Sequence, residues 1–278
     1  KIIKNLKMIR CGITGFDGNL GKTFLKINKT FRFIKFKGDI RKKGQVEKWI
    51  KSNEFDLLVH FAALVPISEV NKKYKDAVNI NYVGTKYLVD AIIKYNKKIS
   101  WFFFSSTSHV YPHKNFKIKE KLKVQPSSKY GKTKLLAENY IIRKLSRTNI
   151  KFCIGRIFSI LDNKNKDFFL ASLLKKINNK KKLIYLTNYN HRRDFLTTDQ
   201  ISRIIFHLWR KKKFGIINIG SGIKTDLRDL AIFLAKKKNK KVSFGYNKPT
   251  CLVADISKLK KTGFKVRKLN LKSFTNYI

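Results

Sequence analysis

The feature that most limits how this chain can fold is a regular alternation of short apolar segments with segments of helical periodicity over the first 160 residues. Buried parallel strands are nearly continuous apolar runs, whereas amphipathic helices repeat their apolar residues every three or four positions. The expected strands are 9–13, 30–36, 55–62, 100–105 and 152–158, and the expected helices are 20–27, 45–51, 82–95 and 128–145. This alternation predicts an α/β fold with a doubly wound parallel sheet.

A glycine-rich turn lies between the first expected strand and the first expected helix. The segment 14–21 carries glycines at its second, fifth and eighth positions. Glycines at this spacing let the backbone turn tightly and approach a pyrophosphate, which then lies at the positive end of the helix. The turn therefore predicts a dinucleotide-binding site at the end of the first strand.

Further short motifs follow this turn in a recognisable order. They are Gly38-Asp39-Ile40, His60-Phe61-Ala62-Ala63, the segment 81–85, Tyr130 with Lys134, the segment 193–196 with Asp199, and the segments 218–222 and 254–258. Over essentially the whole chain, this order resembles the extended short-chain dehydrogenases/reductases of the NAD-dependent epimerase/dehydratase family. The resemblance implies a Rossmann-like doubly wound sheet with a smaller C-terminal substrate lobe.

The resemblance also implies a division of the chain. We expect residues 1–160 to form the NAD(P)-binding domain, and residues 161–278 to form mainly the substrate lobe, with some segments returning to the sheet. In the second part, the expected helices are 168–178, 199–211 and 227–237, and the expected strands are 183–186, 216–219 and 242–244. Lysine runs at 180–182, 211–213 and 236–238 are expected to end helices, because cations complement the helix dipole there.

The positions matching the family's cofactor site imply contacts to NADP(H) or NAD(H). They are Gly15, Phe16, Asp17, Gly18, Asn19, Leu20, Gly21, Asp39, Ile40, Phe61, Ala62, Ala63, Asn81, Ser105, Tyr130 and Lys134. The expected strand 30–36 has no acidic end residue to bind a free ribose 2′-hydroxyl. Arg32, Lys35, Lys37 and Arg41 are available to a 2′-phosphate instead, so the sequence favours NADP(H).

Tyr130 and Lys134 are four residues apart on an expected helix and therefore lie on one face. A nearby cation favours the ionised form of a phenol, which makes it a usable proton donor or acceptor. The resemblance adds Thr107 as the third catalytic residue. It implies that Lys134 also holds the nicotinamide ribose.

The substrate contacts implied by the resemblance are Thr107, Ser108, His109 and Arg193. Arg193 would contact the nucleotide diphosphate, although its neighbour Asp194 offers a structural salt bridge as an alternative role. His109 is either an acid/base group near the sugar or a polar loop residue. No metal site is expected, because Cys11, Cys153 and Cys251 lie far apart.

The residues around the catalytic group bear on the reaction. Family members that dehydrate a hexose carry Asp-Glu after the catalytic Thr, where this chain has Ser108-His109. Double epimerase/reductases resembling GDP-fucose synthases need a second His after the Tyr-Lys helix, and none lies between Lys134 and His191. Both reactions are therefore disfavoured.

The stretch between Gly21 and Asp39 is short, as in sugar 4-ketoreductases that resemble dTDP-4-dehydrorhamnose reductase. We therefore expect reduction of a nucleotide-linked 4-keto-6-deoxyhexose, with Tyr130 as proton donor. A nucleotide-sugar 4-epimerase with bound NAD is the alternative. A non-catalytic basic protein that binds NAD(P) or nucleic acid is an alternative of another class.

The charge is strongly positive, with 64 Lys and Arg against 17 Asp and Glu, a net of +47. Such an excess is typical of proteins that bind polyanions. Here lysine dominates and is scattered, whereas arginine, the better phosphate and base reader, is scarce. We interpret the excess as solvated surface and expect no specific nucleic-acid partner.

Sparse cysteines of odd number are typical of the reducing cytoplasm, where we expect the protein. The apolar runs are too short to span a bilayer. Family members often dimerise through the helices that correspond to 82–95 and 128–145. The resemblance therefore implies a homodimer.

Overall fold

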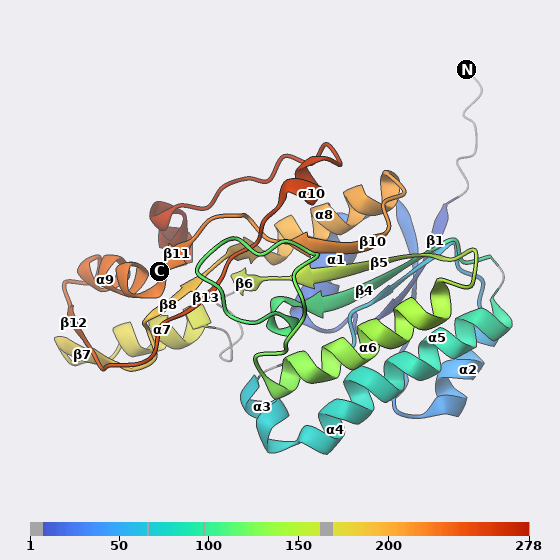
Figure 1. Cartoon of the computed structure of the whole chain (residues 1–278), viewed down its shortest axis with the longest axis horizontal. Helices are drawn as coiled ribbons and strands as arrows, with labels where there is room; N and C mark the ends of the chain where they lie inside the picture. Colours follow the sequence, from blue (N-terminus) through green and yellow to red (C-terminus); the bar gives the residue numbers. More distant parts are fainter. Residues whose placement is uncertain (1–7, 66, 97, 162–168, 278) are drawn as a thin grey trace.

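The computed structural model describes residues 8–65, 67–96, 98–161 and 169–277. Its central sheet contains β1 (Ile9–Thr14), β2 (Phe31–Lys35), β3 (Leu57–His60), β4 (Trp101–Thr107), β5 (Lys151–Ile157) and β10 (Gly215–Ile219). The strands lie in the order β10-β5-β4-β3-β1-β2, and every neighbouring pair is parallel (Figure 1). The predicted α/β fold with a doubly wound parallel sheet is confirmed.

Helices cover both faces of this sheet. On one face, α1 (Asn19–Ile27) packs against α8 (Thr198–Arg210). On the other face lie α2 (Lys43–Lys51), α5 (Gly84–Tyr95) and α6 (Lys129–Leu145), side by side in Figure 1. Each face has its own hydrophobic core. Burial on both sides explains why β3 and the first half of β4 are continuous apolar runs.

Among the described residues, the sheet ends at β2, one strand earlier than in the usual dinucleotide-binding order, in which a further strand follows outside β2. The chain instead runs from β2 through Asp39 and α2 to β3, which pairs with β1 on the side opposite β2. The short stretch between Gly21 and Asp39 therefore corresponds to the loss of one strand–helix unit.

The connection from β3 to α5 contains elements that were not predicted. They are α3 (Ile67–Lys72), α4 (Tyr74–Val78) and a π-helical turn at Asn79–Val83 that continues into α5. The first two are too short to show a helical period, and lysines interrupt them. A π-helical turn inside a helix is uncommon and is often found at functional sites.

In the described residues of the second half of the chain, small sheets and the helices α7, α9 and α10 accompany α8. The elements are β6 (Ser159–Leu161), α7 (Phe169–Ile177), β7 (Leu183–Leu186), β8 (His191–Arg193), β9 (Phe195–Thr197), β11 (Thr225–Asp226), α9 (Leu227–Lys236), β12 (Lys241–Phe244), β13 (Thr250–Leu252), α10 (Ser257–Lys260) and a final 3-10 segment, Leu271–Tyr277. Residue 168 of the expected helix 168–178 lies outside the described residues. The three small sheets have the orders β11-β8-β13, β12-β7 and β6-β9.

A third hydrophobic core lies among α7, α9 and the end of the chain, and includes Leu173, Leu230 and Phe274. Two later segments return to the main sheet: β10 pairs with β5, and α10 packs beside β10. There Lys258 Nζ donates a hydrogen bond to the carbonyl of Ile216 at 2.6 Å.

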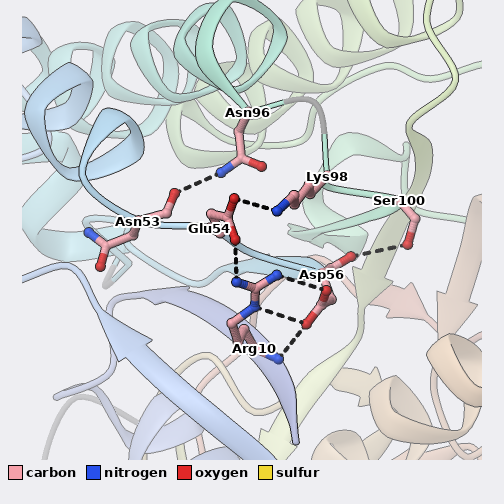
Figure 2. Close-up of polar contacts among 7 residues, drawn as sticks. All are labelled: Arg10, Asn53, Glu54, Asp56, Asn96, Lys98 and Ser100. Atoms are coloured by element: carbon pink, nitrogen blue, oxygen red, sulfur yellow. Dashed lines mark hydrogen bonds and ion pairs between the residues drawn. The ribbon is translucent and has the colours of Figure 1, made fainter. Parts of the chain in front are cut away.

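The amino ends of the strands are tied by an ion-pair cluster, shown in Figure 2. Arg10 of β1 binds the Glu54 carboxylate at 2.6 Å, and its backbone N–H donates to Asp56 at 2.7 Å. Lys98 also binds Glu54, while Ser100 donates to the Asp56 carbonyl. The two cations hold the pKa of Glu54 at about 2. This cluster fixes the sheet at the end opposite the glycine turn.

Candidate active site

A cavity of about 900 Å3 lies at the carboxyl ends of β1, β3, β4 and β5, where the C-terminal half meets the sheet. Ligands of open parallel sheets bind at this end of the strands. Most of the residues singled out from the sequence line this cavity: Gly15, Asp17, Gly18, Asn19, Leu20, Gly21, Phe61, Ala62, Ala63, Ser105, Thr107, Ser108, His109, Tyr130 and Arg193.

The glycine turn is packed too tightly for side chains at two positions. Gly15 has a φ of 65°, and a Cβ there would lie 2.5 Å from the backbone N of Ala62. A Cβ on Gly21 would lie 2.2 Å from the carbonyl oxygen of Gly15. No side chain caps α1 at Gly18, so the positive end of this helix is presented to the cavity as a dinucleotide site requires.

Five of the sequence-derived residues do not line the cavity. Asp39 forms an ion pair with Arg41 at 2.8 Å, and Ile40 is buried against Gly84. The ring of Phe16 lies under the Lys35 ammonium, 5.5 Å from Nζ to the ring centroid. The other two, Asn81 and Lys134, are buried behind the wall. The cofactor contacts assigned to these five residues, like those assigned to the residues that line the cavity, stay predictions.

The predicted catalytic pair, Tyr130 and Lys134, lies on the first turns of α6. The helix begins after Ser128, whose hydroxyl accepts a hydrogen bond from the backbone N–H of Gly131 at 3.0 Å. Tyr130 faces the cavity, whereas Lys134 lies one turn deeper with Nζ 4.2 Å from the centroid of the Phe104 ring. The helical spacing that was predicted is therefore present.

Burial governs the protonation of both groups. It lowers the pKa of Lys134 to about 7, against the opposing attraction of the Glu138 carboxylate. It raises the pKa of Tyr130 well above the usual phenol value. From the sequence, the Lys134 cation was expected to favour the phenolate of Tyr130. In the structure, desolvation of the phenolate is the larger effect on its pKa. Tyr130 is consequently a neutral phenol near neutral pH.

The end of β4 supplies the opposite wall. Thr107 lines the cavity, and its hydroxyl oxygen accepts a hydrogen bond from the backbone N–H of His109 at 3.3 Å, which leaves the hydroxyl hydrogen available as a donor. The His109 ring packs edge-on against Tyr130, with centroids 6.2 Å apart. Burial, together with the charges of Arg193 and His113, lowers the pKa of His109 to about 4. His109 is therefore neutral.

Arg193 enters the cavity from β8 as a cation surrounded by neutral acceptors. Its guanidinium donates to the hydroxyl of Thr250 at 2.9 Å, to the carbonyl of Thr250 at 3.2 Å and to the carbonyl of Arg192 at 2.9 Å. Burial lowers the pKa of Arg193 to about 10. Within the described part of the chain no carboxylate pairs with it, so an anionic ligand group suits this position.

Asp194 points away from Arg193, so the alternative of a salt bridge between these neighbours is wrong. Its buried carboxylate accepts hydrogen bonds from the backbone N–H groups of Ser221, Gly222 and Ala254, and from the Ser221 hydroxyl. Arg193 therefore lines the cavity, whereas Asp194 binds the turn after β10.

One ionisable residue of the cavity wall, His191, was not predicted from the sequence. Its Nδ1 lies 2.8 Å from the hydroxyl of Thr250, the same hydroxyl that Arg193 contacts. No motif marks this histidine, and only the pairing of β8 with β13 brings it to the site.

Among the described residues, no cluster of His, Cys, Asp and Glu has the arrangement of a metal site. None of the helices in these residues is both long and apolar enough to cross a bilayer.

A glycine turn at a helix N-terminus, and Tyr130 across the same cavity with Lys134 one helical turn behind it, define a Rossmann-type oxidoreductase site of the short-chain dehydrogenase/reductase class. Residues 12–220 match the NAD dependent epimerase/dehydratase family, and the chain belongs to this family. The resemblance inferred from the motifs is confirmed.

Individual relatives and solved structures are similar to this chain over nearly its whole length. UDP-glucose 4-epimerase from Mycoplasma genitalium is 26% identical over 290 residues, covering 94% of this chain and 85% of the relative. The structure of RMD from Pseudomonas aeruginosa, complexed with NADPH, has a TM-score of 0.85 at 18% identity and covers 97% of this chain and 96% of that chain. A dTDP-4-dehydrorhamnose reductase structure from Clostridium acetobutylicum has a TM-score of 0.84 at 20% identity, with coverages of 97% and 98%. These structural likenesses describe the fold.

Proposed function

We propose that the chain is an NAD(P)-dependent oxidoreductase that reduces the 4-keto group of a nucleotide-activated 6-deoxyhexose. The observation that carries this proposal is one cavity lined by the glycine turn, the Thr107–Tyr130 pair and Arg193. These three parts suit a dinucleotide, a reacting sugar carbon and a diphosphate, respectively. The bound nicotinamide supplies the hydride chemistry.

The side chains divide the remaining work. The Thr107 hydroxyl donates a hydrogen bond to the sugar oxygen, which orients the carbonyl and polarises it. Tyr130 gives its proton to the same oxygen as the carbonyl is reduced, and its raised pKa keeps the phenol protonated before this step. Arg193 holds the diphosphate and so fixes the distance between the nucleotide and the reacting carbon.

Two observations favour reduction. The sheet lacks one strand–helix unit outside β2, the shortening expected of sugar 4-ketoreductases. Ser108 and His109 follow the catalytic Thr, in place of the Asp-Glu pair that dehydration of a hexose requires.

A 4-epimerase is the second candidate, favoured by the similarity to the Mycoplasma UDP-glucose 4-epimerase across 94% of this chain. In that reaction Tyr130 has to be ionised first: as the phenolate it accepts the proton of the sugar hydroxyl, and it returns this proton after the sugar has turned over. The same residues serve both reactions, so the state of the cofactor discriminates between them.

We also propose NADP(H) as the preferred cofactor. Lys35 ends β2 with its ammonium over the Phe16 ring of the glycine turn, where a 2′-phosphate on the adenosine ribose is expected. Arg41 is engaged by Asp39 instead. The variant Lys35→Ala is expected to raise the Kd for NADPH about tenfold and to leave that for NADH unchanged. The exposed Lys29→Ala, just before the amino end of β2, is the matched control.

We further propose that the protein forms a homodimer through α5 and α6, which expose Ile93 and Leu136. Sedimentation analysis of the parent and of Leu136→Glu tests this. A dimer that becomes a monomer in the variant supports the interface, whereas a monomeric parent contradicts it.

The primary experiment incubates the purified protein with NADPH or NADH and a panel of nucleotide-linked 4-keto-6-deoxy sugars, and follows the absorbance of the reduced cofactor. Oxidation that is lost in Tyr130→Phe, by at least about 100-fold, supports the reductase. Absence of oxidation with every keto-sugar, together with NAD+ released from the denatured protein, overturns the reductase in favour of the epimerase.

A further inference from the structure

The buried imidazole of His60 stands at the centre of a hydrogen-bond chain behind the cavity wall. His60 ends β3 and has no solvent exposure. Its Nδ1 lies 2.6 Å from the hydroxyl of Thr14, at the end of β1, and its Nε2 lies 2.8 Å from the hydroxyl of Thr85, at the start of α5. The ring packs on Phe104, and the Lys134 ammonium also lies over the Phe104 ring.

The donors and acceptors around His60 determine which nitrogen carries the proton. Thr85 donates its single hydroxyl hydrogen to the carbonyl of Asn81 at 2.8 Å, so towards Nε2 it can only accept. The hydroxyl of Thr14 accepts the backbone N–H of Ala62 at 3.2 Å and has its own hydrogen left for Nδ1. The tautomer protonated at Nε2 therefore gives every one of these hydrogens a partner, whereas the reverse tautomer leaves the Thr14 hydroxyl hydrogen without an acceptor among the described residues.

The series of hydrogen bonds continues to α6 through Asn81 of the π-helical turn. The backbone N–H of Leu64 donates to Asn81 Oδ1 at 2.7 Å, which identifies the amide oxygen without ambiguity. Asn81 Nδ2 then donates to the hydroxyl of Thr133 at 3.0 Å, and Thr133 donates to the carbonyl of Tyr130 at 2.8 Å. Hydrogen bonds thus run from Ala62, beside the glycine turn, to the backbone of the catalytic tyrosine.

The imidazole has to be neutral for this arrangement, because a protonated ring has no acceptor for Thr14. Full burial and the charge of Lys134 lower the pKa of His60 to about 3. Lys134, on α6, is the charged group that faces His60; the rings of Phe102 and Phe104 from β4 cover its side. His60 is therefore neutral throughout the physiological pH range.

We propose that His60 is a positioning residue: as the neutral tautomer protonated at Nε2, it holds the glycine turn and the catalytic helix in one fixed arrangement. It touches neither cofactor nor substrate and acts through Thr14 and Thr85. The inference rests on the proposed function in so far as the glycine turn binds the cofactor. The protonation state of the ring is measurable without cofactor or substrate.

The first test is the nitrogen NMR spectrum of the parent protein labelled with 15N-histidine, assigned by comparison with His60→Gln. We expect His60 to give a protonated Nε2 and an unprotonated Nδ1, unchanged between pH 6 and pH 9. A protonated Nδ1, or titration within this range, contradicts the proposal. This outcome is independent of any reaction, so a failed activity assay does not obscure it.

The second test is the affinity for NADPH and NAD+, measured by fluorescence titration and calorimetry. His60→Leu removes both hydrogen bonds and is expected to weaken binding of the better cofactor about tenfold. His60→Gln keeps one donor and one acceptor and is expected to recover most of this loss. His207→Leu, which removes an imidazole bound to Thr262 outside the cavity, controls for the loss of any partly buried ring.

Parent-like cofactor affinity in a folded His60→Leu protein overturns the positioning role. If His60→Leu does not fold, Thr14→Val takes its place, because it leaves the imidazole in the protein and removes the hydroxyl that donates to Nδ1 and accepts the Ala62 N–H. We expect that variant to lose affinity as well, and not to lose more when combined with His60→Gln; fully additive losses contradict the shared chain. A parent protein that binds neither cofactor refutes the proposed function, while the NMR result still decides the tautomer.

Discussion

Gly131 and His109 meet backbone to backbone: a Cβ atom on Gly131 would lie 2.1 Å from the carbonyl oxygen of His109. This contact joins the first turn of α6 to the 3-10 turn Ser108–Val110 that follows β4. Thr107 and Tyr130 are thereby held on opposite walls of one cavity, and no side chain at position 131 is compatible with that spacing.

The variant Gly131→Ala is therefore expected to lower stability by about 1–3 kcal/mol and to reduce turnover, because α6 must move away from His109. Denaturant unfolding measures the first effect, and the oxidation of NADPH by the best keto-sugar measures the second. Gly44→Ala is the matched control, since nothing lies within 4 Å of a Cβ placed there in α2. We expect the control to be stabilised by about 0.5–1 kcal/mol; equal losses in both variants would refute the close contact.

The buried Lys134 makes stability depend on pH in a defined direction. Its folded pKa, about 7, is lower than the usual value of 10.5, so the unfolded chain binds more protons between these pH values and stability rises with pH across this window. Lys134→Met removes the cost of burying the charge. We expect it to stabilise the protein at pH 6 by on the order of 3 kcal/mol relative to its effect at pH 10. Thermal unfolding at the two pH values checks this, and a pH-independent effect contradicts it.

The two neighbouring arginines are expected to differ in substrate binding. Arg193→Met is expected to raise the KM for the nucleotide sugar by about 10- to 100-fold with a smaller change in kcat, because the diphosphate loses its cation. The free protein should not lose stability, since this buried guanidinium has only neutral partners. Arg192→Gln, which removes a half-exposed pair with Asp226, is the control and should leave KM unchanged. Similar KM values for the two variants would argue against the anion site.

A buried ion pair supports the strand that carries Thr107. Arg156 binds Glu138 at 2.6 Å, with both side chains almost fully buried, and Ser106 of β4 donates to the same carboxylate. Arg156→Met leaves this carboxylate buried without a cation and should cost about 3–5 kcal/mol in unfolding free energy. The double variant with Glu138→Gln is expected to lose clearly less than the sum of the single losses, which a double-mutant cycle measures. Additive losses would contradict the coupling.

The parts of this fold that were predicted from the sequence are those with local signals. The runs before the glycine turn and before Thr107 are apolar because helices cover both sheet faces, and the Tyr130–Lys134 spacing is a direct consequence of helix geometry. The elements α3 and α4, and the two- and three-residue strands of the C-terminal half, are shorter than any detectable period. Their existence depends on packing and not on propensity.

The site was less predictable than the fold. The partner of Asp194 lies in the turn after β10, far along the chain, and no spacing rule indicates it. The position of His191 likewise follows from the pairing of β8 with β13. The pKa of Tyr130 depends on how deeply α6 is buried, whereas the motif alone suggested only its cationic neighbour. Tertiary contacts therefore determine the protonation state of Tyr130 and the hydrogen-bond partners of Asp194. The local sequence indicates only on which strand or helix a motif residue lies.

Shortening the sheet by one unit leaves β2 as its terminal strand. A bare strand edge is a template for adding a strand from another molecule, which leads to aggregation. Here β2 carries Arg32 and Lys35, both exposed, and like charges on a second copy of the chain would repel this pairing. The positive charge of β2, part of a surplus that identifies no ligand by itself, thus opposes pairing of two copies of the chain through this edge of the sheet.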